Sequence, residues 1–355
     1  MKVEKSKLAR ALKSLGRIAD GKSPLPVLRC VWGHAEGDVL RLVATDMKVA
    51  LALELEATVP APMSFVVSAK DLATRVELAP GDDVTFALKG DTLHLSSGSR
   101  KYALGSASVE DFPKLPVMPG ASVLEVDGNV FRELIRKTSF AIAENASRPA
   151  LACSLLEFGD GIARMVTTDG HRLSMAELDA PGALTMMLPE KAVFEVRKLL
   201  DGQRGIEVER AGVDGFFRIP GAVLSVRLGD EATFPPYRQV LPSQSACHAK
   251  VVRDDLAQAV RGVAVAEAVG SSVKFGFAPG SLSLSAQSPA TGEATDAVEI
   301  KYHGEAVTIG LHAEYVLDVL TALSDETVGI EFSGVLDPVS IRAPGYHGVV
   351  MPMRV

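Results

Sequence analysis

The stretch 167–173 reads Thr-Thr-Asp-Gly-His-Arg-Leu and brings a carboxylate, an imidazole and a guanidinium within four residues. Asp169 and His171 could exchange protons in general acid–base catalysis, and Arg172 could bind an anion. Thr-Asp-Gly is also a turn signal, because Asp bonds its own backbone and Gly adopts positive φ. The three side chains could therefore simply follow a turn into a strand, and the motif alone leaves these alternatives open.

The last seven residues, 349–355, read Val-Val-Met-Pro-Met-Arg-Val. A chain end is usually polar and frayed, whereas this segment is mainly apolar. We expect such residues either to complete a core or to form the wall of a binding surface.

Composition limits the class of protein. With 355 residues, 47% hydrophobic and 23% charged, the chain is expected to be globular with two or three domains. We find no apolar run of the ~20 residues that a membrane span needs, and no signal peptide. Cys30, Cys153 and Cys247 are far apart, which favours reduced thiols in a cytoplasm over a disulfide or metal framework. The net charge of −7 argues against a generally basic coat but allows a local basic surface.

The elements that would position the motif recur along the chain. An apolar stripe with helical spacing begins at Leu8 and returns from Phe131 and Leu256, which lie 123 and 125 residues further on in turn. A second helix follows in each unit, with stripes that begin at positions 72, 193 and 316. Ser68 is the expected N-cap of the first of these. Six helices in three similar units are therefore predicted.

Alternating strands lie between the helices. Examples are 39–43, 84–88, 206–209 and 282–285, joined by hairpin turns such as 89–91 and 159–161. Two landmarks repeat as well: Thr-Asp at positions 45 and 168, and Phe-Pro at positions 112 and 234. The pattern predicts an α+β protein with a threefold internal repeat, in domains 1–120, 121–245 and 246–355.

Cations gather on matching helices of this acidic chain. The first helical segment and the turn after it carry Lys7, Arg10, Lys13, Arg17 and Lys22, and the later ones carry Arg132, Arg136, Lys137, Lys191, Arg197 and Lys198. A solvated helix face is the ordinary explanation of such a run. Recurrence on equivalent helices favours contact with the phosphates of a polyanion, without sequence readout. In the third unit, acidic residues offset the cations.

Together, the repeat, the stretch 167–173, the stretch 234–242 (Phe-Pro-Pro-Tyr-Arg-Gln-Val-Leu-Pro) and the terminal Met-Pro-Met-Arg resemble the bacterial DNA polymerase III beta subunit family, the sliding clamps. The resemblance covers the whole chain. It implies the processivity fold, in which each domain has two helices and antiparallel sheets. It also implies a head-to-tail homodimer closed into a ring around duplex DNA.

The resemblance further implies a protein without catalytic activity, cofactor or metal, acting in the bacterial cytoplasm at the nucleoid. Its implied partners are double-stranded DNA, a second copy of the chain, the DNA polymerase III alpha subunit, clamp-loader subunits and other proteins with a clamp-binding motif. The Asp169–His171 pair also lacks a nucleophile in motif spacing. An enzyme built on these two residues, and a specialised clamp paralogue, are the alternatives.

Two sets of residues, the cleft and the dimer interface, are carried over from the family by position, and the DNA-facing set rests on the cations of the helices. The partner-peptide cleft is Leu151, Thr168, Gly170, His171, Arg172, Leu173, Pro235, Val240, Val349, Val350, Met351, Pro352 and Met353. The DNA-facing set adds Arg148 to Lys7, Arg10, Lys13, Arg17, Lys22, Arg132, Arg136, Lys137 and Lys198. The dimer interface is Arg100, Lys101, Tyr102 and Leu104 on one side and Ala264, Val265, Glu293 and Asp296 on the other.

The chain also departs from the family pattern. Loops 147–150 and 268–272 lack the aromatic residues that are common there, and Gln239 stands where Arg is common. We expect these differences to alter the preferred partner sequence and the DNA contacts.

Overall fold

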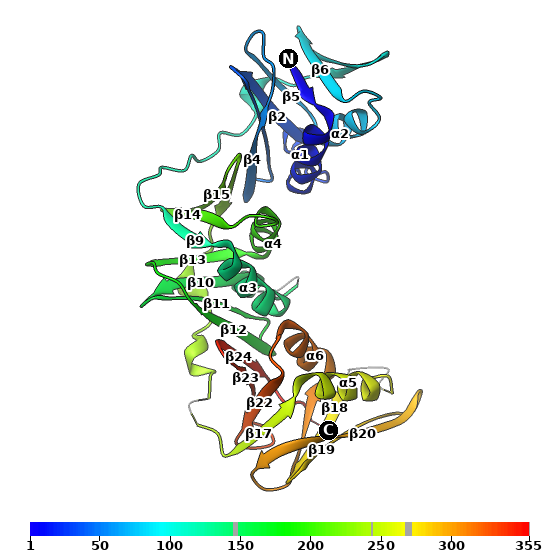
Figure 1. The fold of residues 1–355 in the computed structure, drawn as a ribbon, viewed down its shortest axis with the longest axis vertical. Coiled ribbons are helices and arrows are strands. Elements are labelled where there is room, and N and C mark those ends of the chain that lie inside the picture. Colours follow the sequence, from blue (N-terminus) through cyan, green and yellow to red (C-terminus); the bar gives the residue numbers. More distant parts are fainter. Residues whose placement is uncertain (145–147, 243, 267–271, 355) are drawn as a thin grey trace. The chain divides into compact units, whose positions relative to one another are not determined.

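A computed structural model describes residues 1–144, 148–242, 244–266 and 272–354 (Figure 1). These residues form six helices: α1 (Lys5–Ile18), α2 (Ala69–Glu77), α3 (Gly128–Thr138), α4 (Glu190–Leu199), α5 (Arg253–Ala264) and α6 (Ala313–Ala322). All six coincide with the predicted helical segments, so the prediction of two helices per repeat is confirmed.

The strands follow one order in each repeat. The first repeat has β1 (Lys2–Glu4), β2 (Cys30–Glu36), β3 (Val39–Thr45), β4 (Val49–Glu56), β5 (Met63–Ser68), β6 (Asp83–Lys89), β7 (Thr92–Ser97) and β8 (Arg100–Gly105). The second has β9 (Leu124–Asp127), β10 (Cys153–Gly159), β11 (Ile162–Thr168), β12 (Arg172–Asp179), β13 (Leu184–Pro189), β14 (Gly205–Ala211), β15 (Asp214–Ile219) and β16 (Ala222–Arg227). The third has β17 (Cys247–Val252), β18 (Ser272–Ala278), β19 (Ser281–Ser288), β20 (Gly292–His303), β21 (Val307–His312), β22 (Thr327–Phe332), β23 (Val339–Ala343) and β24 (Tyr346–Val350).

These strands pair into sheets that run on from one repeat to the next. One sheet has the order β5-β2-β3-β4-β16-β15-β14-β9, and another continues β13-β10-β11-β12 into β24-β23-β22-β17-β20-β19-β18-β21. A third has the order β1-β6-β7-β8. The pairings are antiparallel throughout, as predicted, and β4 meets β16 in the same way that β12 meets β24.

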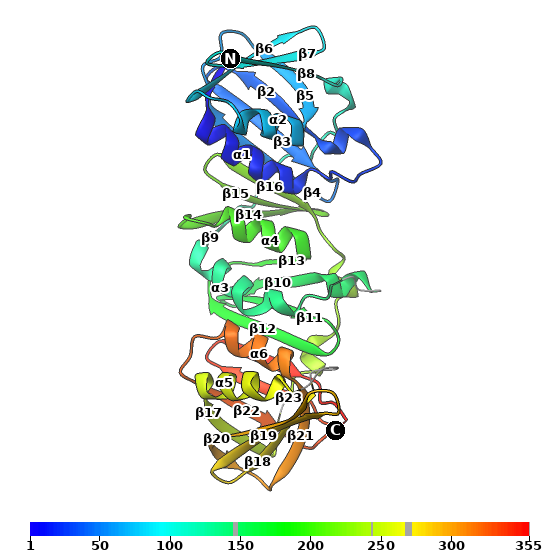
Figure 2. The ribbon, with the colours of Figure 1, turned by 90° about the vertical axis from the view of Figure 1, so that its right-hand side faces the viewer.

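The chain forms two compact units, residues 1–128 with 194–228, and residues 129–193 with 229–355. In the first unit α1 packs beside α2, and in the second α5 packs beside α6 (Figure 2). The predicted stripe of α1 is buried at Leu8, Leu12 and Leu15, each at most 1% exposed. Full burial of such side chains contributes about 1.5–3 kcal/mol each, so the apolar face explains why this segment folds as a helix on the sheet. Ser68 caps α2 as expected, accepting the Asp71 N–H at 3.2 Å.

A buried carboxylate holds the segment between the first two repeats. Glu209 on β14 is 1% exposed and accepts the N–H groups of Gly120, Ala121 and Ser122 at 2.7, 2.8 and 3.0 Å. Burial opposes the charged form, yet the three N–H groups hold the pKa of the Glu209 carboxyl below its usual value. The predicted boundary near residue 120 therefore lies on an anchored segment.

A buried histidine makes the stability of the second unit depend on pH. His347 on β24 is 3% exposed, and its Nε2 lies 2.9 Å from Ser340 Oγ. Burial lowers the pKa of His347 from 6.5 to about 4, and the charge of Arg342 acts in the same direction.

We expect the free energy of unfolding to fall as the pH drops from about 6.5 to about 4. In that window the unfolded imidazole takes up a proton that the folded one excludes. Urea unfolding at pH about 7 and about 5 measures the loss, which His347→Gln should reduce. The exposed His303 provides the control, His303→Gln, which should leave the loss unchanged. An equal loss in wild type and His347→Gln would contradict this assignment.

Candidate functional site

The stretch 167–173 forms the tight turn between β11 and β12. Asp169 Oδ1 accepts the N–H groups of His171 and Arg172 at 2.9 and 3.0 Å. Thr168 Oγ1 donates to the Arg172 carbonyl at 2.6 Å and accepts the N–H of Gly170, whose φ is +93°. The turn predicted from Thr-Asp-Gly is confirmed. Oδ1 of Asp169 is thus used for the backbone bonds that fold the turn.

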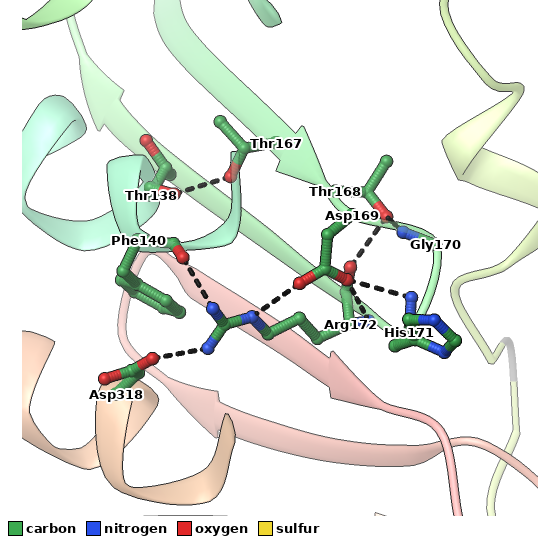
Figure 3. A network of polar contacts seen from close by, with 9 residues as sticks. All are labelled: Thr138, Phe140, Thr167, Thr168, Asp169, Gly170, His171, Arg172 and Asp318. Carbon is green, nitrogen blue, oxygen red and sulfur yellow. Dashed lines mark hydrogen bonds and ion pairs between the residues drawn. The ribbon is translucent and has the colours of Figure 1, made fainter. Parts of the chain in front are cut away.

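Arg172 is bonded inside the fold. Its Nε lies 3.0 Å from Asp169 Oδ2, Nη2 donates to the Phe140 carbonyl at 2.7 Å, and Nη1 pairs with Asp318 of α6. The guanidinium also stacks over the Tyr315 ring, 4.4 Å from the centroid. Figure 3 shows the side chain directed toward Asp318 and Phe140, on the other side of the turn from His171. The Arg172 side chain is 11% exposed. Because it pairs with Asp318, it joins β12 to α6.

A cavity of about 170 Å³ opens beside this turn. It is lined by ten of the thirteen residues predicted for the cleft: Leu151, Thr168, Gly170, His171, Arg172, Leu173, Pro235, Val240, Val349 and Met351. Segments far apart in the sequence thus form one cavity, with exposed His171 and Val240 at its mouth. Met351 is 39% exposed and contributes an adaptable apolar wall.

The other three predicted cleft residues lie beside the cavity. Val350 is fully buried and pairs with Arg172 and Val339 in the sheet. Met353 donates its N–H to the Gly310 carbonyl of β21 at 2.8 Å, and Pro352 lies between Met351 and Met353. These residues hold the chain that presents Met351. Their direct contact with a partner stays a prediction.

Two further residues line the cavity that were not predicted for it. They are Arg148, which belongs to the predicted DNA-facing set, and Tyr237, which lies within the motif 234–242. Tyr237 is 4% exposed, and its hydroxyl donates to Glu157 at 2.6 Å. Burial and this bond raise the pKa of Tyr237 to about 12. An aromatic residue after two prolines is the signal that could have identified it as a wall residue.

The floor of the cavity is an apolar cluster. It consists of Cys153, Leu155, Val166, Leu173, Met175, Met187, Phe234, Tyr237 and Val349, with Ala150 and Leu241 packed against it. A rigid apolar floor with a few polar groups at the rim suits an apolar side chain of an extended peptide.

The predicted DNA-facing cations differ in their surroundings. Arg10, Lys13 and Lys22 are exposed. Lys7 pairs with Glu56 at 2.8 Å, and Arg136 pairs with Glu133. Arg17 and Lys198 both pair with Glu195 on α4, at 3.3 and 2.6 Å. Lys137 is 7% exposed, so it adds little to a cationic surface. Arg132 is half-buried, with its Nη2 bonded to Asn129, and Arg148 is exposed at the cavity.

The residues predicted for the dimer interface lie on two strands and at one helix end. Arg100, Lys101 and Tyr102 lie on β8 and are exposed or half-buried, whereas Leu104 is 7% exposed and belongs to the core. Glu293 and Asp296 are exposed on β20. At the end of α5, Ala264 is half-buried and Val265 is 75% exposed.

In the described part of the chain, no helix is both long and apolar enough to cross a membrane. The same residues contain no cluster of His, Cys, Asp and Glu side chains suited to a metal ion. Positions 147 and 268–271 of the two loops that lack family aromatics, and Val355, lie outside the described residues.

The comparisons with known proteins match one family along nearly the whole chain. Models of the three domains of the DNA polymerase III beta subunit match in order: the N-terminal domain at 1–116, the central domain at 125–235 and the C-terminal domain at 238–354. The chain is 31% identical to the beta sliding clamp of Caulobacter vibrioides and 28% identical to that of Pseudomonas putida, with 99% of each chain covered.

Two solved structures are also similar. One is the beta sliding clamp of Caulobacter crescentus, with a TM-score of 0.95 and 30% identity over 100% of this chain and 99% of that one. The other is the DNA polymerase III subunit beta of Pseudomonas aeruginosa, with a TM-score of 0.93 and 27% identity over 100% of both chains.

We expect Arg172→Met to destabilise the second unit strongly. The change leaves Asp169 and Asp318 without their cation. Breaking the largely buried pair with Asp169 costs about 3–5 kcal/mol, whereas the half-exposed Asp318 adds little. Urea unfolding measures the loss. The neighbouring His171→Ala is the control, expected within about 0.5 kcal/mol of wild type because the side chain is exposed. Equal stability of the two variants would show that Arg172 does not hold β12 to α6.

Proposed function

The chain belongs to the DNA polymerase III beta subunit family, and on that basis we propose that it is a DNA sliding clamp. In this role it encircles duplex DNA without reading the sequence and tethers replication and repair proteins through the cavity beside Thr168 and Met351. The observation that carries the proposal is the match of all three domains, in order, along one chain. The role requires no catalysis, in agreement with the structural use of Asp169 and Arg172.

The repeat itself supports ring closure by two copies. Edge strand β4 of the first repeat pairs with β16 of the second, and β12 of the second pairs with β24 of the third. By its place in the sheet order, β20 corresponds to β4 and β12, and β8 corresponds to β16 and β24. Among the described residues, β8 and the 292–299 part of β20 each have a strand on one side only.

We propose that β8 of one copy pairs with β20 of another, so that two such contacts close a ring. The contact is heterologous and continues the pattern used twice within the chain. Arg100 and Lys101 on β8 oppose Glu293 and Asp296 on β20, which gives charge complementarity. Exposed Val265 supplies apolar area to the contact. Leu104 is buried and supports β8 from the core.

The DNA surface is proposed on the helices that carry Arg10, Lys13, Arg17 and Lys198. Glu195 offsets part of the charge of Arg17 and Lys198, which suits weak phosphate contact. A threaded ring needs only weak contacts because topology keeps it on the DNA. The polymerase alpha subunit, the clamp loader and other motif-bearing proteins are the proposed partners, in the cytoplasm at the nucleoid.

The proposed function predicts topological retention. Once loaded by a clamp loader, the protein should stay on circular duplex DNA and leave after the circle is cut, because only a free end releases a closed ring. Gel filtration of the DNA–protein complex before and after cutting measures this. Lys101→Glu should shorten retention on the circle by weakening the β8–β20 contact. Equal retention on circular and linear DNA would contradict the ring.

A second prediction concerns the cavity. Met351→Ala should weaken binding of a clamp-binding-motif peptide from the polymerase alpha subunit by about tenfold, or ~1.4 kcal/mol, because it removes an exposed apolar wall. Fluorescence anisotropy measures the affinity, and the melting temperature should change little. Met353→Ala is the matched comparison and should weaken binding less, since Met353 does not line the cavity. A large fall in melting temperature with unchanged affinity for Met351→Ala would show that Met351 is a packing residue.

A further inference from the structure

The first unit contains a cavity of about 280 Å³ that the proposed function does not use. It lies at the turn between β3 and β4, next to the end of β16. Three cations line it, Lys48, Lys114 and Arg227, with Met47 and Leu115 among the apolar residues. Among the described residues, Asp214 is the one carboxylate in its lining.

This cavity is the internal repeat of the peptide cleft. Asp46 Oδ1 accepts the N–H groups of Lys48 and Val49 at 2.9 and 2.7 Å, as Asp169 does for His171 and Arg172. The Arg227 N–H donates to the Lys48 carbonyl at 2.7 Å. The Met351 N–H donates to the His171 carbonyl at 2.9 Å in the same way. The same backbone frame therefore presents a concave site in both repeats.

The side chains on that frame differ in charge. Lys48 stands where the second repeat has His171, and Arg227 stands where the third has Met351. Lys48 and Lys114 are exposed, and the Arg227 side chain is 58% exposed and 3.5 Å from Asp214. An ion pair this exposed leaves Arg227 accessible to another anion. The lining therefore favours a ligand with carboxylate groups.

Met47 at the mouth of the cavity has an unusual backbone conformation. Its φ is +74°, in the left-handed region, where the second repeat has Gly170 with φ of +93°. A residue with a Cβ is strained there, and Met47 nevertheless points an apolar side chain that is 60% exposed at the rim. Such strain suits a residue kept for contact with a ligand, and methionine adapts to varied apolar partners.

An apolar slot adjoins the cationic cavity. It also measures about 280 Å³, and the two cavities share Lys114 and Leu115. Trp32, Val43 and Phe112 line the slot. Trp32 and Leu115 are partly buried against the cluster that contains Val43 and Phe112. The slot can take a large apolar side chain next to the carboxylate-binding cations.

We propose that this pair of cavities is a second docking site, which binds an extended protein segment that carries carboxylates beside large apolar residues. Duplex DNA is the less suitable occupant, because its phosphates would meet the cations but leave the Trp32 slot and Met47 unused. The site would give a partner a second contact with the same protein, distinct in charge from the cleft at Met351.

The test follows the ε-methyl signal of Met47 by NMR in the full-length protein labelled at methionine methyl groups, with the signal assigned from Met47→Leu. The probes are a capped peptide of alternating glutamate and leucine, and one of alternating lysine and leucine. We expect a saturable Met47 shift with the acidic peptide only. Lys48→Glu with Arg227→Glu should weaken it at least about fivefold, the loss typical of two partly exposed ion pairs. Lys89→Glu, an exposed charge on β6, is the matched control and should change nothing.

Three results would overturn the proposal. The first is the absence of a saturable Met47 shift with the acidic peptide, whether or not the peptide shifts the Met351 signal. The second is a shift that persists in the double variant. The third is a duplex oligonucleotide that moves Met47 at lower concentration than the peptide, with the same sensitivity to charge reversal, since the cavity would then contact nucleic acid. The readout needs neither a ring nor a loaded clamp, so it is independent of the proposed function.

Discussion

The antiparallel pairing of β12 with β24 is the contact on which the cavity beside Thr168 and Met351 depends. It sets Leu173 opposite Val349 and Arg172 opposite Val350, and it continues to the bond between the Met351 N–H and the His171 carbonyl. A slip of one residue would turn Val349 away from the cavity floor and bring Val350 to it, because side chains alternate along a strand. The register of one ladder therefore determines which residues line the cavity.

Asp169 and Arg172, the residues that suggest catalysis in the sequence, hold the β12–β24 pairing in place. Asp169 folds the turn through backbone bonds, and Arg172 carries its charge into the contact with Asp318 and Phe140. The first repeat keeps the Asp46 bonds but has Val49 where Arg172 stands. The turn geometry thus needs only the Thr-Asp pair, whereas Arg172 is specific to the contact with α6.

The helices and strands could be predicted because their apolar periodicity is strong, as in α1. The same pattern also recurs at equivalent positions in all three repeats. The resemblance named ten residues that the structure brings to one cavity, and their contact with a partner stays a prediction. The burial of a single side chain did not follow from the sequence: Lys137 is 7% exposed although it lies in a cationic run. Tyr237 was missed for the same reason. Its position depends on packing against Glu157, which is 80 residues away in the chain.

The outer strands β8 and β20 also affect how the protein behaves while a ring is open. A strand with a free edge is a template for the strands of other chains, and proteins commonly protect such edges with charged side chains. Arg100 and Lys101 on β8, with Glu293 and Asp296 on β20, provide this protection. Because the two edges carry opposite charges, each repels its own kind, so two β8 edges or two β20 edges would not join. The charges proposed to select the neighbouring copy would thus also keep open subunits from aggregating through their edges.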